Sequence, residues 1–156
     1  MKNDKPIFLI LCTILIAISY IFIYERNSMS KEIIFTEKAP KAIGPYSQAV
    51  KANGFLFVSG QIPLNPATGD LMNASIEDQA EQVIKNLTSI CEAANLTLSD
   101  IVKLTIYITD MKDFAVVNEA MLKHFKEPYP ARATVEVSAL PLGVNVEMDA
   151  ILLAHD

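Results

Sequence analysis

The sequence predicts an α+β domain in which two helices pack on one face of an antiparallel or mixed β-sheet. Three observations support this fold class. Apolar residues alternate with a period of two in several short segments, they recur with the helical period in two longer segments, and turn-forming residues separate these segments. The expected order of elements is therefore β-ββ-α-β-α-β-β, with no internal repeat and no low-complexity segment.

The start of the domain is expected to form a short strand followed by a β-hairpin. The strand spans residues 31–35. Asn53 and Gly54 then separate two segments of alternating apolar residues, 47–52 and 55–59. Both central residues of a type I′ turn need positive φ, which Asn and Gly adopt at low cost. The two segments should therefore pair as antiparallel strands.

Two helices are expected, with a strand between them. The first begins at Ser75, which together with Asp78 has the shape of a capping box, and its apolar residues follow one helical face as far as Ala94. Residues 100–110 return to the period of a strand. The second helix spans about 113–126 and is stopped by the two prolines that follow it.

The last two strands each carry a candidate functional residue. Arg132 follows the rigid sequence PYPA at the start of the first strand. Glu147 lies within the second strand, on the same face as Asp149 and opposite Val146. A hairpin centred in the sequence LPLGV would place Glu147 beside Glu136. The spacing therefore does not prove that Glu147 and Arg132 meet.

Each of these two residues has an ordinary interpretation and a functional one. Arg132 is either a surface arginine at a strand end or an anion clamp, because a guanidinium presents a planar fork that matches a carboxylate. Glu147 lies either on a solvated sheet face or on a face that another subunit closes. In the second case the loss of water would raise its pKa toward the range that is useful for proton transfer.

Four further residues have the same two kinds of interpretation. Tyr46 follows a turn and is either a core residue or a hydroxyl directed at a ligand. Ser59 and Gly60 end a strand, where the hydroxyl and exposed backbone N–H groups could bind an anion, although a serine beside a glycine is also ordinary turn chemistry. Asn118 lies beside the apolar stripe of the second helix, and we interpret it as structural.

Several strands have apolar residues on both sides, for example in FLFV and AILLA. The sheet face that the helices leave open should therefore be buried by self-association, for which a closed symmetric ring is the usual arrangement.

Composition excludes several classes of protein. The chain has two cysteines and two histidines, Cys12, Cys91, His124 and His155. These numbers give no disulfide framework and no three-histidine metal site within one chain. Residues 29–156 carry a net charge of −6 with no basic run, which disfavours nucleic-acid binding. We therefore expect no metal, no cofactor and no nucleic-acid partner.

The N-terminal segment, residues 1–28, differs from the domain at 29–156. Its apolar run at 6–24 has the length of a helix that spans a bilayer. It is interpreted as a membrane anchor, with a processed leader or a start codon placed too early as alternatives. The domain is accordingly expected to be membrane-anchored, on a side of the membrane that the sequence does not determine, or cytoplasmic if translation starts at Met29.

Four motifs carry a resemblance to a known family. The sequences IGPYSQAV, FVSGQIP, VNEAMLKHF and PARATVEVSALPLGVNVEM resemble the RidA, or YjgF-like, family of reactive-intermediate deaminases. The resemblance covers residues 29–156 and leaves out the N-terminal segment. It implies a chorismate-mutase-like α+β fold, assembled as a homotrimer with ligand pockets between subunits.

The resemblance also implies an activity, that of a 2-iminobutanoate/2-iminopropanoate deaminase. Such enzymes hydrolyse enamines and imines such as 2-aminoacrylate and 2-iminopropanoate to a 2-keto acid and ammonia. Arg132 would bind the substrate carboxylate, Glu147 would position or activate water, and Tyr46 and Ser59 would line the cleft. Thr134 stands where many members have a cysteine, so thiol-dependent behaviour should be absent.

Two alternatives to this activity stay open. The first is a non-catalytic module that binds 2-keto acids or a partner protein in the same cleft. The second is ribonuclease activity, which has been assigned to some relatives. The negative net charge of the domain disfavours it.

Overall fold

The structure, a computed structural model, describes residues 12–19, 31–72 and 75–154. The chain divides into two compact units, Met1–Ser30 and Lys31–Asp156. In the first unit the described residues are helical. None of the helices among the described residues combines the length and the apolar character that crossing a bilayer requires. The predicted membrane anchor at 6–24 thus gains no support, and most of that range lies outside the described residues.

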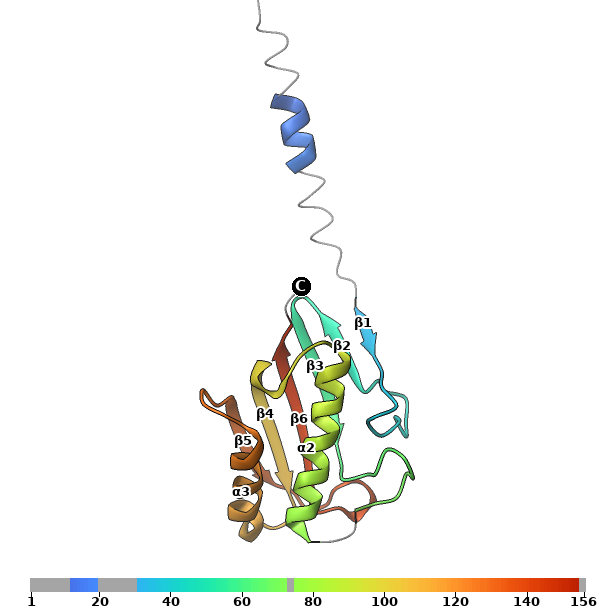
Figure 1. Ribbon diagram of the computed structural model, residues 1–156, viewed down its shortest axis with the longest axis vertical. Coiled ribbons are helices and arrows are strands. Elements are labelled where there is room, and N and C mark those ends of the chain that lie inside the picture. The colour runs from blue at the N-terminus through green and yellow to red at the C-terminus, as the bar shows by residue number, and fades with distance from the viewer. Residues whose placement is uncertain (1–11, 20–30, 73–74, 155–156) are drawn as a thin grey trace, which may run out of the picture. The chain divides into compact units, whose positions relative to one another are not determined.

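The second unit contains a six-stranded sheet in the order β1-β2-β3-β6-β4-β5, with helices α2 and α3 on one side of it (Figure 1). The predicted α+β class and the predicted order of the main elements are confirmed. The strands and helices are β1 (Glu32–Ile34), β2 (Ala49–Ala52), β3 (Phe55–Gln61), α2 (Ile76–Ala93), β4 (Ile101–Ile108), α3 (Phe114–His124), β5 (Ala131–Glu136) and β6 (Val146–Leu153).

Local sequence signals set the hairpin and the start of the first long helix. β2 and β3 pair antiparallel around Asn53 and Gly54, whose φ angles are 51° and 75°. At the start of α2, the Ser75 hydroxyl oxygen accepts the backbone N–H of Asp78 at 3.2 Å. α3 ends two residues earlier than expected, because Phe125 adopts an extended backbone and is buried.

The predicted hairpin between the last two strands is wrong. β5 pairs with β4 in parallel, and β6 pairs antiparallel with both β3 and β4, so β4 separates β5 from β6. Glu136 consequently lies beside Ile108 and accepts the backbone N–H of Met111 at 2.7 Å. The physical reason is burial. β6 alternates buried with half-buried residues and takes a central place, whereas the largely exposed β5 takes the edge.

The two faces of the sheet differ in what covers them. The helix face, which α2 and α3 cover, contributes alternate residues of β4 and β6 to the main core, including Leu104, Ile106 and Met148. The opposite side is here called the open face. Apolar side chains such as Phe57 and Val135 are exposed on it. Burial of the open face by self-association stays a prediction.

A buried asparagine ties α2 to the loop that follows β3. The Asn86 side-chain amide donates to the carbonyl oxygens of Ile62 and Leu64 at 3.1 and 3.0 Å. Its own carbonyl oxygen accepts an N–H of Gln82 at 2.9 Å. Asn86 is 1% exposed, so these two loop carbonyls have little access to water. The amide therefore holds a loop whose backbone would otherwise be left unpaired in the core.

Replacing Asn86 with alanine should lower the free energy of unfolding by about 1–3 kcal/mol, because the change strands buried carbonyl groups. Chemical denaturation of the purified protein measures this loss. Gln82→Ala is the matched control, since it removes one bond to Asn86 but leaves both loop carbonyls paired. Equal losses for the two variants would contradict the role assigned to Asn86.

Candidate functional site

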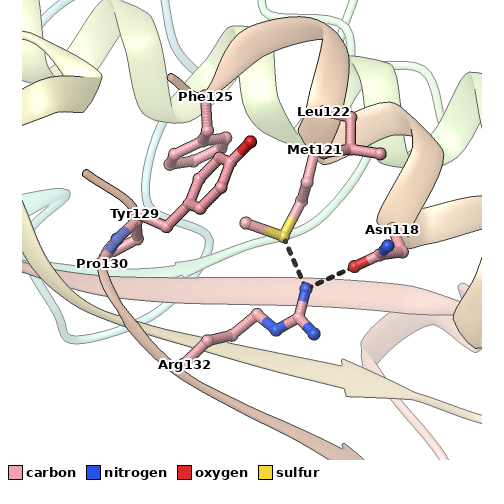
Figure 2. Close-up of a pocket in the computed structure, with 7 residues that line it drawn as sticks. All are labelled: Asn118, Met121, Leu122, Phe125, Tyr129, Pro130 and Arg132. Carbon is pink, nitrogen blue, oxygen red and sulfur yellow. Dashed lines mark hydrogen bonds between the residues drawn. The ribbon is translucent and has the colours of Figure 1, made fainter. Parts of the chain in front are cut away.

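Arg132 lies on the helix face of the edge strand β5. It pairs with Leu104, a core residue of β4, so the two side chains leave the sheet on the same side. Its Nη1 donates to Asn118 Oδ1 at 2.7 Å and contacts Met121 Sδ at 3.5 Å, as Figure 2 shows. The guanidinium also lies 5.4 Å from the centre of the Phe114 ring. These contacts from α3 restrict the arginine to one orientation.

The guanidinium borders a cavity of about 440 Å³. Its lining is mostly apolar, and this Arg132 cavity consists of Asn118, Met121, Leu122, Phe125, Tyr129, Pro130 and Arg132 (Figure 2). Within the described residues, Arg132 donates hydrogen bonds from Nη1 alone, which leaves Nη2 and Nε for an external partner. A fixed cation against apolar walls is a suitable anchor for a small carboxylate that carries an apolar group.

Glu147 lies on the open face, on the other side of the sheet from Arg132. Its neighbours Val146 and Met148 are buried in the core, so alternation along β6 directs Glu147 away from the helices. It borders a second cavity of about 250 Å³. The lining of this Glu147 cavity is Ile43, Tyr46, Ser59, Gly60, Ile62, Pro141 and Glu147.

Gly60 is required by the close approach of the Glu147 side chain. The pairing of β3 with β6 is irregular between Val58 and Gln61, and Gly60 lies in this irregular stretch. A Cβ atom on residue 60 would overlap Glu147 Oε1 and lie 2.8 Å from its Cδ. A glycine therefore leaves room for the carboxyl group to lie against the β3 backbone, a role that turn chemistry did not indicate.

Burial raises the pKa of the Glu147 carboxyl, and the nearby charge of Asp149 raises it further. Among the described residues, no hydrogen-bond donor to the Glu147 carboxyl stabilises its ionised form. A half-buried carboxyl with a raised pKa is a candidate for proton exchange with a bound molecule.

The other predicted residues of the cleft lie in the Glu147 cavity. The Ser59 hydroxyl donates to the carbonyl oxygen of Ser47 at 2.7 Å, so its oxygen keeps acceptor capacity toward the cavity. The Tyr46 hydroxyl accepts the backbone N–H of Ile43 at 3.3 Å, and this tyrosine is 47% exposed. Tyr46, Ser59, Gly60 and Glu147 thus form one group, and Arg132 stands apart from it within a single chain.

Sequence reasoning treated Asn118 as structural, but the structure makes it the hydrogen-bond partner of Arg132. Phe114, Asn118 and Met121 follow one another at helical spacing and all contact the guanidinium. That helical spacing was the sequence signal by which Asn118 could have been grouped with Phe114 and Met121. Thr134 lies two residues beyond Arg132 on the same strand, and its buried hydroxyl oxygen has no hydrogen-bond partner within the described residues.

The described part of the chain offers no group of three or more histidine, cysteine, aspartate or glutamate side chains that could hold a metal ion. His124 Nε2 lies 2.6 Å from Glu81 Oε2, away from both cavities described above. His155 lies outside the described residues.

Comparison with known proteins identifies the family to which this fold belongs. The sequence model described as endoribonuclease L-PSP matches residues 36–154. The Arabidopsis thaliana protein named reactive intermediate deaminase A, chloroplastic, is 49% identical over 127 residues, which are 81% of this chain and 68% of that protein. The Homo sapiens protein named 2-iminobutanoate/2-iminopropanoate deaminase is 40% identical over 127 residues, which are 81% of this chain and 93% of that protein.

Solved structures agree with the sequence comparison. RidA from the Antarctic bacterium Psychrobacter sp. PAMC 21119 has a TM-score of 0.76 with this chain at 48% identity, over 78% of this chain and 98% of its own. The chain therefore belongs to the RidA (YjgF-like) family, which its sequence motifs indicated.

Gly60→Ala should turn the Glu147 carboxyl out of its cavity at a cost of about 1 kcal/mol in stability, because the atoms that a methyl group would displace are the end of a flexible side chain. A crystal structure of the variant checks the position of Glu147, and thermal denaturation checks the cost. Gly44→Ala is the control, since a Cβ there meets only the Tyr46 ring at 3.4 Å. A structure of the Gly60→Ala variant in which Glu147 keeps its position would refute the contact between Gly60 and the Glu147 carboxyl.

Proposed function

We propose that this protein hydrolyses reactive imines and enamines, converting 2-aminoacrylate and its tautomer 2-iminopropanoate to a 2-keto acid and ammonia. Membership of the RidA family supports a deaminase in general, since relatives at 40% and 49% identity are named as deaminases. The observation that carries the proposal is the fixed guanidinium of Arg132, an anchor for the carboxylate that these substrates share.

Arg132 would orient the substrate. The unused N–H groups of the guanidinium can donate two parallel hydrogen bonds to the carboxylate, which sets both its position and its plane. Because Asn118 and Phe114 already hold the guanidinium, little side-chain freedom is lost when the substrate binds. The imine carbon, one bond from the carboxylate, is then presented in a defined direction.

Glu147 would assist the addition of water. The carbon of a protonated imine is electrophilic, so a water molecule can attack it without a strong nucleophile. Glu147 accepts a proton from that water as the carbon–oxygen bond forms, which gives a carbinolamine. Return of that proton to nitrogen lets the carbon–nitrogen bond break, while Glu147 takes the hydroxyl proton as the new carbonyl forms, and the products are ammonia and the 2-keto acid. General acid–base assistance of this kind typically contributes ~10²–10⁴-fold.

The two groups lie on opposite faces of one sheet, so the proposed site needs more than one chain. We propose a homotrimer in which Arg132 of one subunit faces Glu147, Tyr46 and Ser59 of its neighbour. The exposed apolar residues of the open face support this assembly, because their burial between subunits would stabilise it.

A second candidate function is the binding of 2-keto acids without turnover. It is favoured by one observation, the complete Arg132 cavity on a single chain, which could hold a carboxylate without Glu147. This second function would be favoured if calorimetry detects binding of a 2-keto acid and the protein does not accelerate imine hydrolysis. Ribonuclease activity, which the family description mentions, is disfavoured by the −6 charge of residues 29–156.

Arg132→Ala should lower kcat/KM for 2-iminopropanoate on the order of 10²-fold, because it removes the charged two-pronged donor that would bind the substrate carboxylate. The imine is generated enzymatically, and its loss is followed above the spontaneous rate. Arg132→Lys should recover only part of the activity, since lysine keeps the charge but not the fork. Lys85→Ala, an exposed change of equal charge, is the control. Full activity in Arg132→Ala would reject the proposal.

Mixing two inactive variants tests the site between subunits. If Arg132 and Glu147 act across an interface, trimers assembled at random from equal amounts of Arg132→Ala and Glu147→Gln chains should recover about a quarter of the wild-type sites. If both residues act within one chain, the mixture should stay inactive. Refolding the variants together and separately, followed by the same imine assay, distinguishes these outcomes.

A further inference from the structure

Two carboxyl groups lie side by side on the open face of β6, and their surroundings differ. Glu147 and Asp149 are two residues apart and therefore project from the same side of the strand. Asp149 Oδ2 accepts the hydroxyl proton of Tyr107 at 2.8 Å. Glu147 instead borders its cavity beside Gly60, and its carboxyl accepts no hydrogen bond from the described residues.

Tyr107 reaches Asp149 from the position directly opposite Glu147. The register of β4 against β6 pairs Tyr107 with Glu147 and Thr105 with Asp149. The tyrosine side chain thus runs diagonally, past its own partner, to the next carboxylate on the same face. Its hydroxyl stays protonated, because the hydrogen bond to Asp149 raises the pKa of Tyr107, as burial does to a smaller extent.

Two carboxyl groups that project from the same side of one strand oppose each other's ionisation, because each negative charge disfavours the other. A hydrogen-bond donor that binds one of the two carboxyl groups makes the groups unequal. The group with the donor keeps its negative charge, and the group without it becomes the one that binds and releases the proton. Here the Tyr107 hydroxyl is the donor to Asp149, and Glu147 is the carboxyl group without such a donor among the described residues.

We propose that Tyr107 and Asp149 are positioning residues for Glu147: the Tyr107 hydroxyl holds the Asp149 carboxylate, so that Glu147 alone exchanges the proton during water addition. The inference rests on the proposed deaminase function. Neither residue needs to touch the substrate, because both act through the charge beside Glu147.

The other titratable groups near Glu147 do not alter this assignment. Tyr46 faces the Glu147 cavity from the loop before β2, and β3 and the segment before β6 contribute uncharged residues there. Lys103, the cation of β4 on the open face, pairs with Ile151, two rows of the sheet away from Glu147. Within one chain, Asp149 is therefore the charged group that acts on Glu147, and Tyr107 acts through its hydrogen bond to Asp149.

Asp149→Asn should move the acid limb of the kcat/KM profile to lower pH, because Glu147 loses a neighbouring negative charge and ionises more readily. Tyr107→Phe should broaden that limb, since the two carboxyls would then titrate as a coupled pair. Glu92→Gln, an exposed change of equal charge on α2, should leave the profile in place.

Carbon-13 NMR of labelled glutamate carboxyls gives a readout that needs no activity. The Glu147 signal, assigned by its loss in Glu147→Gln, should titrate at lower pH in Asp149→Asn than in the wild type. An unchanged Glu147 titration in both variants would overturn the positioning role. Tyr107→Phe removes a single oxygen atom, so it decides the question if Asp149→Asn does not fold. A wild type without deaminase activity would instead refute the proposed function, whatever the titration shows.

Discussion

β6 lies between β3 and β4, and antiparallel pairing on both sides holds its register. Alternation then directs Val146 and Met148 into the core under α2 and turns Glu147 to the open face. A shift of one residue would exchange these two sets, placing a carboxyl in the core and apolar residues outside it. The position of the candidate acid–base group is thus coupled to burial of the main core, which is the dominant favourable term in folding.

The anion-binding part of the site is held in a different way. Arg132 belongs to an edge strand with little burial of its own, so pairing with β4 and side-chain contacts from α3 fix its orientation. The hydrogen bond to Asn118 and the contact with the Phe114 ring restrict a side chain that would otherwise sample many rotamers. The same contacts leave part of the guanidinium available, which is what a ligand anchor needs.

These two parts supply the few groups that the proposed reaction would need. An imine with an adjacent carboxylate already has its electrophile and its handle, so one cation and one proton-exchanging carboxyl are sufficient for positioning and proton transfer. The chain accordingly combines a family assignment that rests on most of its length with a small set of polar residues at the two cavities. The separation of those cavities on one chain makes assembly part of the proposed mechanism.

Local sequence patterns were sufficient to predict the hairpin turn at Asn53 and Gly54, the helix cap at Ser75 and the two amphipathic helices. Each of these features depends on residues a few positions apart in the sequence. Alternation likewise predicted that Glu147 faces away from the core, and family motifs supplied the candidate residues. Those features could be determined before any long-range contact was known.

Tertiary structure alone decided which strands are neighbours and which side chains meet. The apparent hairpin at the end of the chain is replaced by a parallel pair with β4, because strands compete across the whole sheet for the buried central places. The contacts of Arg132 with Asn118, of Gly60 with Glu147 and of Tyr107 with Asp149 join segments 14 to 87 positions apart. No local pattern encodes such distances, since they follow from the packing of helices and strands around one core.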